Sequence, residues 1–274
     1  MSKHLHIFCL ALVCLAVAMF VPAQAAVPFD HEHAQFTDVL KKHVRWNGAG
    51  TASAVDYAGL KAQRTGLDEY TAALSQVTAV QLAKFSKLER RAFLINAYNA
   101  FTLQLILTKY PDLASIKDLG GLFSSPWKKA FVPLTGQTRS LDDIEHTLIR
   151  GAADFDDPRI HFAVNCASIG CPSLRPEAFT AGALEAQLQD QTQRFLRDRS
   201  HNYYDAAANT LHLSMIFKWY GSDFERGLLG ANSVPQFVSN YGAAMALSKV
   251  QQQQIGAGKV DLEYTKYDWK LNRR

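Results

Sequence analysis

The sequence predicts an α+β fold in a single domain, with helices packed on a mixed or antiparallel sheet. In several segments apolar residues recur at helical spacing, and in others they alternate as in a half-buried strand. The helices and strands follow one another without the regular strand–helix–strand rhythm of a doubly wound sheet. Hydrophobic residues make up 48% of the 274 residues, and no Pro-, Gly- or Ser-rich linker divides the chain. One hydrophobic core is therefore expected.

The first half of the chain predicts a long buried helix among shorter elements. Helices are expected over residues 31–45, 67–74 and 86–110, and strands over residues 55–57 and 127–134. The long helix begins at Ser86, because Ser86 and Glu89 have the spacing of a capping box. Apolar residues on almost every face indicate burial, and Pro111 ends the helix near Lys109 or Tyr110.

The second half predicts strands and helices on either side of a loop that contains two cysteines. Ile160, Phe162 and Val164 alternate with more polar residues, which predicts a strand over residues 159–165. The other elements expected are a loop over residues 166–176, helices over residues 141–150, 183–199 and 215–220 and from Ser233 onward, and strands over residues 210–213 and 260–264.

The first 25 residues are expected to be a signal peptide that is removed. Lys3 precedes an apolar run over residues 7–21, and Ala23-Gln24-Ala25 provides a cleavage point before Ala26. The run is short for a membrane span, which needs about 20 residues. Residues 26–274 are therefore expected to form a periplasmic or secreted domain with no membrane span after cleavage.

Charge and motif content disfavour several classes of function. The formal net charge is +4 and the basic residues are scattered, so no nucleic-acid partner is expected. The chain has no dinucleotide-binding glycine motif, Walker loop, H-E-x-x-H or G-x-S-x-G. Nucleotide binding, the common zinc-protease mechanism and the α/β-hydrolase mechanism are thereby disfavoured, and no cofactor is expected.

Polar residues on the long helix are candidates for a binding site. Asn96 and Asn99 lie on neighbouring positions of one face, and Glu89 lies on nearly the same stripe. A buried amide without a partner costs about 1–3 kcal/mol, so both amides need partners. Glu89 is expected to cap its own helix, whereas the asparagines could equally pin a neighbouring loop or line a pocket.

A second group of candidates follows the predicted strand at residues 159–165. His161, Asn165, Cys166, Ser168 and Cys171 place an imidazole, an amide, a hydroxyl and two thiols close together in the chain. Strand ends that feed loops commonly carry functional sites. We expect these residues to line one cleft, which Asn96 and Asn99 would face.

The two cysteines allow more than one interpretation. In an oxidising compartment Cys166 and Cys171 could form a disulfide. Alternatively, one of them is a nucleophile activated by an imidazole, although an ideal strand would place His161 and Cys166 on opposite faces. With His161 as a third ligand the spacing matches no standard zinc finger, so no metal site is expected.

The same segments resemble the domain of unknown function five-four-seven, found in bacteria and plants. Residues 91–100 resemble its W-I-N-A-Y-N-A helix, and residues 161–172 resemble its H-F-A-L-N-C-G-S-x-S-C-P segment. Later landmarks of the family are also matched, by Trp219-Tyr220, Asp223-Phe224 and Tyr267-Asp268-Trp269. The chain departs from the pattern with Phe93 for tryptophan, Ala167 for glycine and Gly170 for serine. The resemblance implies a family but no activity.

Two hypotheses of function follow. In the first, the protein is a thiol-dependent hydrolase or acyl transferase, broadly papain- or transglutaminase-like in layout, that acts on peptides or cell-wall fragments. Cys166 or Cys171 would attack a carbonyl, His161 would be the base, and Asn165 or Asn96 would orient the base or bind the oxyanion. In the second, it is a non-catalytic binding or scaffold module with a structural Cys166–Cys171 disulfide. Either would bind an unidentified small molecule or peptide.

Overall fold

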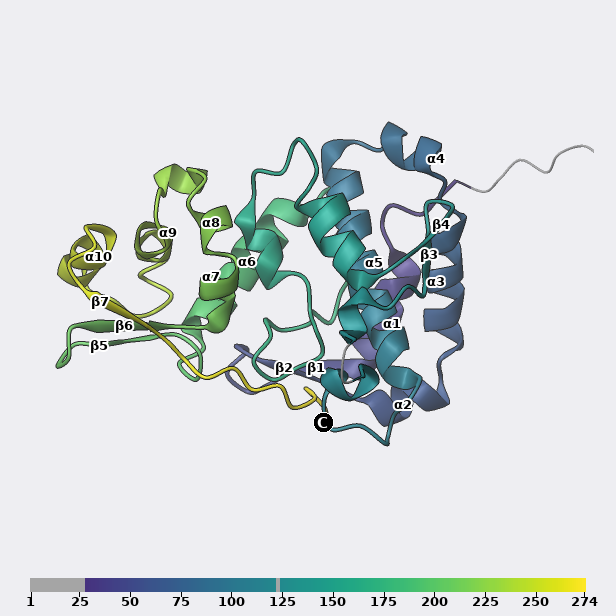
Figure 1. Cartoon of the computed structure of the whole chain (residues 1–274), viewed down its shortest axis with the longest axis horizontal. Coiled ribbons are helices and arrows are strands. Elements are labelled where there is room, and N and C mark those ends of the chain that lie inside the picture. Colours follow the sequence, from purple (N-terminus) through teal and green to yellow (C-terminus); the bar gives the residue numbers. More distant parts are fainter. Residues whose placement is uncertain (1–27, 122–123) are drawn as a thin grey trace, which may run out of the picture.

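Residues 28–121 and 124–274 are described by the computed structural model, which confirms the α+β prediction (Figure 1). The predicted signal peptide lies outside these residues. None of the helices in the described ranges is both long and apolar enough to cross a membrane.

Helices dominate the first half of the chain. The long helix α5 (Lys87–Leu107) is buried on nearly every face, as the sequence predicts, and the Ser86–Glu89 capping box is present. The other elements of this half are α1 (Ala34–His43), β1 (Val44–Trp46), β2 (Ser53–Val55), α2 (Tyr57–Ala62), α3 (Thr65–Gln76), α4 (Ala79–Lys84), the 3₁₀ helices η1 (Ile116–Leu119) and η2 (Pro126–Lys128), β3 (Val132–Leu134) and β4 (Gln137–Arg139).

The second half contains a small three-stranded sheet covered by short helices. Strand β6 (Thr210–Leu213) pairs antiparallel with β5 (Tyr203–Asp205) and parallel with β7 (Asp261–Tyr264). The remaining elements are the π-helical segment η3 (Asp143–Ile149), the 3₁₀ helix η4 (Pro158–Phe162), α6 (Leu184–Arg197), α7 (Met215–Trp219), α8 (Gly221–Phe224), η5 (Leu228–Gly230), α9 (Val234–Asn240) and α10 (Lys249–Gly256).

Two hydrophobic clusters meet at η4. Ile160 packs in the cluster built around α1, α3 and α5, whereas Phe162 packs in the cluster formed by α7, α9 and the three-stranded sheet. The side chain between them, His161, is also buried. One short segment therefore contacts both halves of the molecule.

The predicted strand over residues 159–165 is wrong. Pro158 occupies the first turn of a 3₁₀ helix, and the Asp157 carboxylate accepts a hydrogen bond from the Arg159 N–H at 3.0 Å. Every residue from Pro158 to Asn165 is buried. The alternation of apolar and polar residues therefore did not mark a buried and a solvent-facing side, because the polar side chains are buried with partners of their own.

Two other strand predictions were too long. In residues 127–134 only Val132–Leu134 is a strand, because Pro126 starts a 3₁₀ turn. In residues 55–57 the strand β2 ends at Val55, and Asp56 caps α2 by accepting a hydrogen bond from Gly59 N–H. In both places a residue that favours the start of a helix, Pro126 in the first turn or Asp56 as the cap, begins a helix where the sequence pattern predicted a strand.

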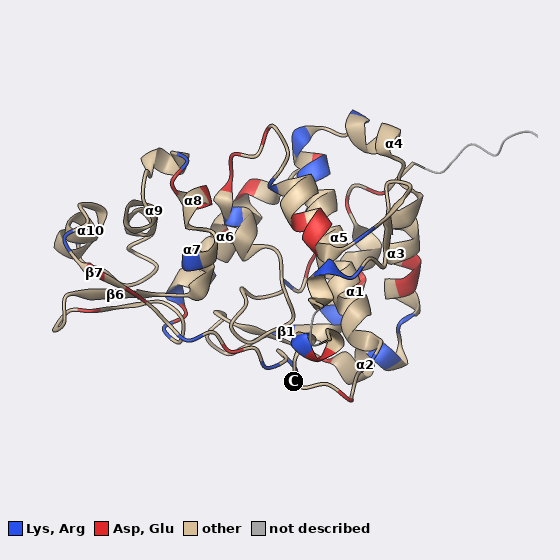
Figure 2. Ribbon diagram, in the orientation of Figure 1, with Lys and Arg blue, Asp and Glu red and all other residues tan. Residues whose placement is uncertain are grey.

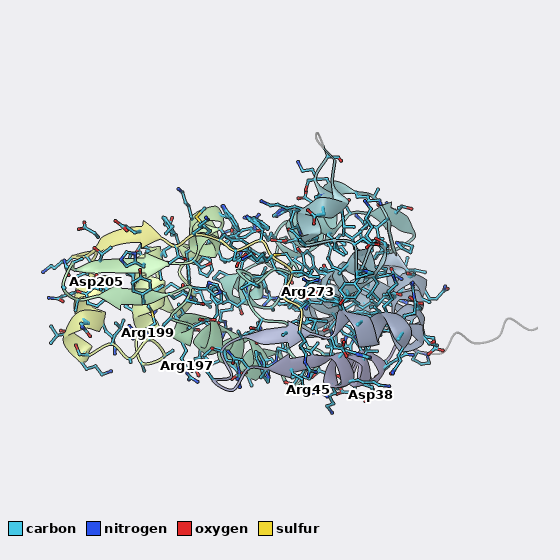
Figure 3. All side chains as sticks on the ribbon, turned by 90° about the horizontal axis from the view of Figure 1, so that it is seen from below. Asp38, Arg45, Arg197, Arg199, Asp205 and Arg273 are labelled. Carbon is cyan, nitrogen blue, oxygen red and sulfur yellow. The ribbon has the colours of Figure 1, made fainter. Side chains whose placement is uncertain are left out.

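The C-terminal segment after β7 returns across the molecule to the first half (Figure 1). The N–H groups of Leu271 and Asn272 donate to the carbonyls of Ala114 and Ala167, at 2.8 and 3.1 Å. Seen from below, Arg273 lies in the middle of the molecule and Asp205 marks the far end of the sheet (Figure 3). This return brings residues 267–269 beside the cysteine loop.

Charged residues of both signs are spread over the helices of both halves (Figure 2).

Candidate functional site

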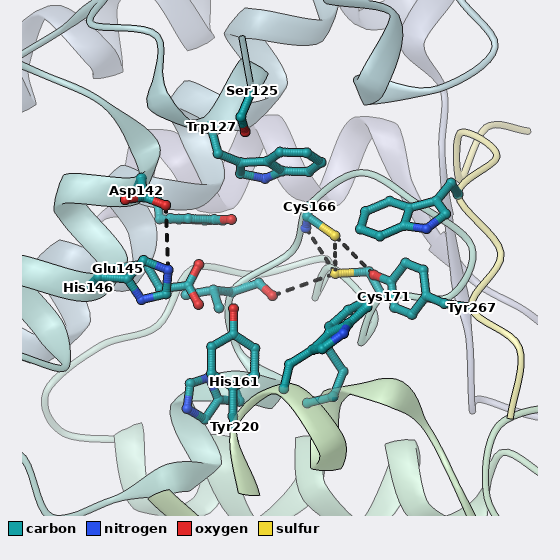
Figure 4. Close-up of a pocket in the computed structure, with 15 residues that line it drawn as sticks. Ser125, Trp127, Asp142, Glu145, His146, His161, Cys166, Cys171, Tyr220 and Tyr267 are labelled. Atoms are coloured by element: carbon teal, nitrogen blue, oxygen red, sulfur yellow. Dashed lines mark hydrogen bonds and ion pairs between the residues drawn. The ribbon is translucent and has the colours of Figure 1, made fainter. Parts of the chain in front are cut away.

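A pocket of about 220 Å³ lies where the two halves meet (Figure 4). Its walls come from α5, the segment around η2, η3, the cysteine loop, α7 and the C-terminal segment. The lining residues are Tyr98, Ser125, Trp127, Asp142, Glu145, His146, His161, Val164, Cys166, Cys171, Ile216, Trp219, Tyr220, Tyr267 and Trp269. Three of the predicted site residues, His161, Cys166 and Cys171, are among them.

The two thiols form the centre of one wall. Cys166 is half-buried and Cys171 is buried behind it, with the two Sγ atoms 2.9 Å apart and both cysteines in the free form. The Ser168 hydroxyl lies 3.3 Å and the Tyr267 hydroxyl 3.1 Å from Cys166 Sγ. Cys166 Sγ is therefore surrounded by three groups that can donate hydrogen bonds.

These neighbours separate the acidities of the two thiols. A hydrogen bond from the Cys171 thiol, followed by those from the Ser168 and Tyr267 hydroxyls, lowers the pKa of Cys166. Burial, together with the adjacent Cys166, raises the pKa of Cys171. Cys166 is therefore the thiol that ionises first, whereas Cys171 keeps its proton.

Asn165 and Asn99 hold the cysteine loop in place. Asn99 donates from Nδ2 to the Ala163 carbonyl at 2.9 Å and accepts from Asn165 N–H at 2.8 Å. Asn165 in turn closes the loop, because its Nδ2 donates to the Pro172 carbonyl at 2.7 Å and its Oδ1 accepts from Ala167 N–H. The loop is thereby fixed to the buried helix α5.

His161 belongs to a buried ionic cluster next to the thiols. Its Nε2 lies 2.8 Å from Asp223 Oδ2, which also accepts a hydrogen bond from Arg150 Nε at 2.6 Å. Its ring stacks on Tyr220 with centroids 3.9 Å apart. Among the hydrogen bonds of the described residues, none joins His161 to either thiol, and Figure 4 shows the ring beside Tyr220, away from the sulfurs.

The same cluster sets the charge states of its members. Burial lowers the pKa of His161, and the hydrogen bond to Asp223 only partly offsets this. Burial alone would raise the pKa of Asp223, but the hydrogen bonds from His161 and Arg150 hold it well below its usual range. The imidazole is therefore neutral near pH 7, and the Asp223 carboxylate is shared between two donors.

Acidic and aromatic side chains form the rest of the pocket. Asp142 lies 3.5 Å from His146 Nε2, and Glu145 points into the cavity from η3 (Figure 4). On another wall, Tyr267 and Trp269 have ring centroids 4.4 Å apart, and Trp219 lies against both. The pocket thus combines two carboxylates, a thiol of lowered pKa and a wall of aromatic rings.

Comparison with known families confirms the resemblance seen in the sequence. Residues 82–196 match the model of a family described as "Protein of unknown function, DUF547". Over this segment, which is less than half of the chain, the protein is similar to the DUF547 family. No curated protein and no solved structure matched the chain.

The DUF547 segment contains α5, η3, η4 and both cysteines, but not the whole pocket. Trp219, Tyr220, Tyr267 and Trp269 follow the matched residues, as does Asp223, which binds His161. The site therefore depends on chain outside the matched segment.

Several predicted binding residues support the pocket without lining it. Asn96 exchanges two hydrogen bonds with the backbone of Phe179, and Asn99 and Asn165 fix the loop as described above. Ser168 reaches the site only through its contacts with Cys166 and Tyr267. Glu89 caps α5 and accepts a hydrogen bond from Ser86 N–H at 2.8 Å. The expectation that Asn96 and Asn99 face the cleft is therefore wrong, because both amide groups hydrogen-bond to backbone groups instead.

Sequence reasoning missed most of the pocket. Glu145 and Trp127 gave no signal, since they looked like ordinary members of a predicted helix and a predicted strand, whereas Tyr98 stands in the matched family helix without a role assigned to it. The signal for Tyr220, Asp223 and Trp269 was present in the family landmarks, which named these positions without giving them a role. No group of three or more His, Cys, Asp or Glu side chains in the described parts of the chain is placed to hold a metal ion.

Proposed function

We propose that this protein is a thiol-dependent hydrolase or acyl transferase with Cys166 as its nucleophile. The observation that carries the proposal is the position of Cys166, in a pocket wall with its pKa lowered by three hydrogen-bonding groups. A thiolate is the reactive form of cysteine, and a partly exposed thiolate beside a cavity is where such chemistry occurs.

In this proposal the Cys166 sulfur adds to the carbonyl carbon of an ester, thioester or amide. The carbonyl electron pair moves to oxygen and then returns as the leaving group departs with its bonding electrons and takes up a proton. Water, in a hydrolase, or an acceptor amine or alcohol, in a transferase, then attacks the thioester and releases Cys166 as a thiolate.

His161 has a different role here from the base expected from the sequence. Its Nε2 is bound to Asp223, and the Cys166 thiolate is supported by Cys171, Ser168 and Tyr267 instead. We assign His161 a positioning role, in which it holds Tyr220 and the η3 wall in place through stacking and the Asp223–Arg150 cluster.

The proposed setting is the bacterial periplasm or the outside of the cell, reached through the signal peptide predicted at residues 1–25. Peptides and cell-wall fragments are the carbonyl substrates proposed for such a location.

A second candidate function is favoured by the contact between the sulfurs. Cys166 and Cys171 Sγ are 2.9 Å apart, so little movement is needed to reach the length of a disulfide, about 2.05 Å. In an oxidising compartment the pair would then be a structural link, and the protein a binding or scaffold module without thiol chemistry.

Thiol alkylation separates the two candidates. In the reduced protein, iodoacetamide should label Cys166 first, with an apparent pKa below the ordinary value of about 8.5, and Cys171 slowly. Cys166→Ser should abolish thiol-dependent hydrolysis of p-nitrophenyl acetate with little change in thermal stability. Equal losses of stability from Cys166→Ser and Cys171→Ser, with no free thiol in the protein as isolated, would instead establish the disulfide module.

A further inference from the structure

We propose that the pocket beside Cys166 takes a ligand group that carries a positive charge, such as a primary ammonium. Glu145 would supply the opposite charge and the surrounding rings the walls. The inference deepens the proposed function, and it rests on that function only in calling the cationic ligand a substrate.

Glu145 is a buried carboxylate with no cationic partner. Its side chain is 6% exposed and points into the cavity (Figure 4). Among residues 28–121 and 124–274 no ion pair includes it, and the nearby basic side chains contact other groups. His146 lies 3.5 Å from Asp142, and Arg150 lies 2.6 Å from Asp223.

Glu145 also affects the acidity of the neighbouring tyrosines. Burial and then the charge of Glu145 raise the pKa of Tyr220 and of Tyr98. A buried carboxylate without a counter-ion is costly. Such a group is explained when a ligand supplies the missing positive charge.

The aromatic rings favour the same kind of ligand. A cation over the face of tryptophan or tyrosine is attracted by the ring, most strongly where water is excluded. Trp269 already holds one such contact, since Lys117 Nζ lies 3.7 Å from its ring centroid. The rings that line the cavity are those of Tyr98, Trp127, Trp219, Tyr220, Tyr267 and Trp269.

The charge balance of the lining disfavours an anionic ligand. Its titratable groups are Tyr98, Asp142, Glu145, His146, His161, Cys166, Cys171, Tyr220 and Tyr267. None of these is a lysine or arginine, His161 is held neutral by burial, and His146 faces Asp142. The volume of about 220 Å³ is below the range of about 300–1,000 Å³ that is typical of drug-sized ligands, so the pocket suits a small group.

The test measures binding in the Cys166→Ser protein, so that its result does not depend on thiol chemistry. Three probes of matched length are compared by tryptophan fluorescence: n-pentylammonium, 1-pentanol and pentanoate. We expect the ammonium to bind at least about tenfold more tightly than the alcohol, and pentanoate to bind most weakly.

Adding Glu145→Gln to the same protein should remove the preference for the ammonium. Asp143→Asn is the matched control, because Asp143 lies on the same helix, outside the pocket lining, and an asparagine oxygen can still accept from Ser140 N–H. This control changes the net charge equally and should leave the preference intact.

Equal binding of the ammonium and the alcohol would overturn the inference, as would an unchanged preference in Glu145→Gln. The three-probe comparison decides the matter even if Glu145→Gln fails to fold. Selective binding of the ammonium in a protein that never shows thiol-dependent activity would reject the proposed function and keep the cation site.

Discussion

At the scale of single residues, the cysteine loop depends on an unusual backbone conformation at Ala167. Its φ is 60°, a left-handed value that glycine adopts at lower cost than alanine. The resembled family has glycine at this position. Here the conformation is held from both sides, since Ala167 N–H donates to Asn165 Oδ1 and its carbonyl accepts from Asn272 N–H. This turn lets Cys166 and Ser168 face the same point.

A buried histidine outside the site should make stability depend on pH. Burial lowers the pKa of His33 to about 4, and its Nδ1 lies 2.7 Å from the Tyr70 hydroxyl. Below about pH 6.5 the unfolded chain binds a proton that the folded protein does not, so stability falls as the pH falls toward 4. We expect His33 to account for a loss of about 2 kcal/mol between about pH 7 and pH 5.

Urea unfolding of the wild type and of His33→Gln at both pH values measures this contribution. The pKa values of His43 and His161 are also lowered by burial, and they contribute equally to both proteins. The variant should therefore lose less stability on acidification than the wild type. Equal losses of stability in the wild type and in His33→Gln would show that His33 does not titrate as its burial implies.

At the scale of elements, α5 positions the site through two side-chain amides, which hydrogen-bond to backbone groups that have no partner in a helix or strand. Asn96 binds the backbone of Phe179, and Asn99 binds the backbone on either side of Val164. Each amide offers a donor and an acceptor in one plane, as a peptide group does. The helix is thereby joined at two points to the long segment between η4 and α6, which has no helix or strand of its own.

Asn99→Leu should destabilise the protein by about 2–6 kcal/mol, although it adds apolar volume to a buried helix. The Ala163 carbonyl and the Asn165 N–H would each be left buried without a partner, at about 1–3 kcal/mol each. The measurement is the free energy of unfolding in urea.

Thr102→Val is the matched control on the same helix. The Thr102 hydroxyl is buried and has no hydrogen-bond partner among the described residues, so its removal should leave stability unchanged or raise it by about 1 kcal/mol. A stable Asn99→Leu protein with an intact site would mean that the loop keeps its place without α5.

At the scale of the whole molecule, the site exists only where distant segments meet. Tyr267 is 101 positions from Cys166 in the chain, and its ring lies in the cluster with Trp219 and Trp269. Gly170 allows this approach, because a Cβ there would lie 2.9 Å from the backbone nitrogen of Asp268. The C-terminal segment therefore completes the environment of the thiol.

Tyr267→Phe should raise the apparent pKa of Cys166 and slow its alkylation at pH 7, because one of three hydrogen-bonding groups on the sulfur is lost. The ring is kept, so thermal stability should change little. Tyr264→Phe on β7 is the control, since its hydroxyl makes no contact with the thiols. If the pH dependence of the alkylation rate were unchanged in Tyr267→Phe, the other two groups alone would set the pKa of Cys166.

Local signals in the sequence determined much of the helical framework. Ser86 and Glu89 cap α5 as their spacing predicts, and Ser140 caps the segment that contains η3. Such signals work because their partners lie within a few residues of one another. The cysteine loop was also recognised, because His161, Cys166 and Cys171 stand close together in the chain.

Tertiary structure decided what those residues do. The alternation at residues 159–165 predicted a strand, but burial between two hydrophobic clusters and the Asp157 cap made a 3₁₀ helix. Tertiary packing also paired His161 with Asp223, 62 positions away, and turned Glu145 into a cavity whose other walls come from α5, the segment around η2, the cysteine loop, α7 and the C-terminal segment. Contacts across such separations leave no periodic trace in the sequence, because they depend on how whole elements pack rather than on the spacing of neighbours.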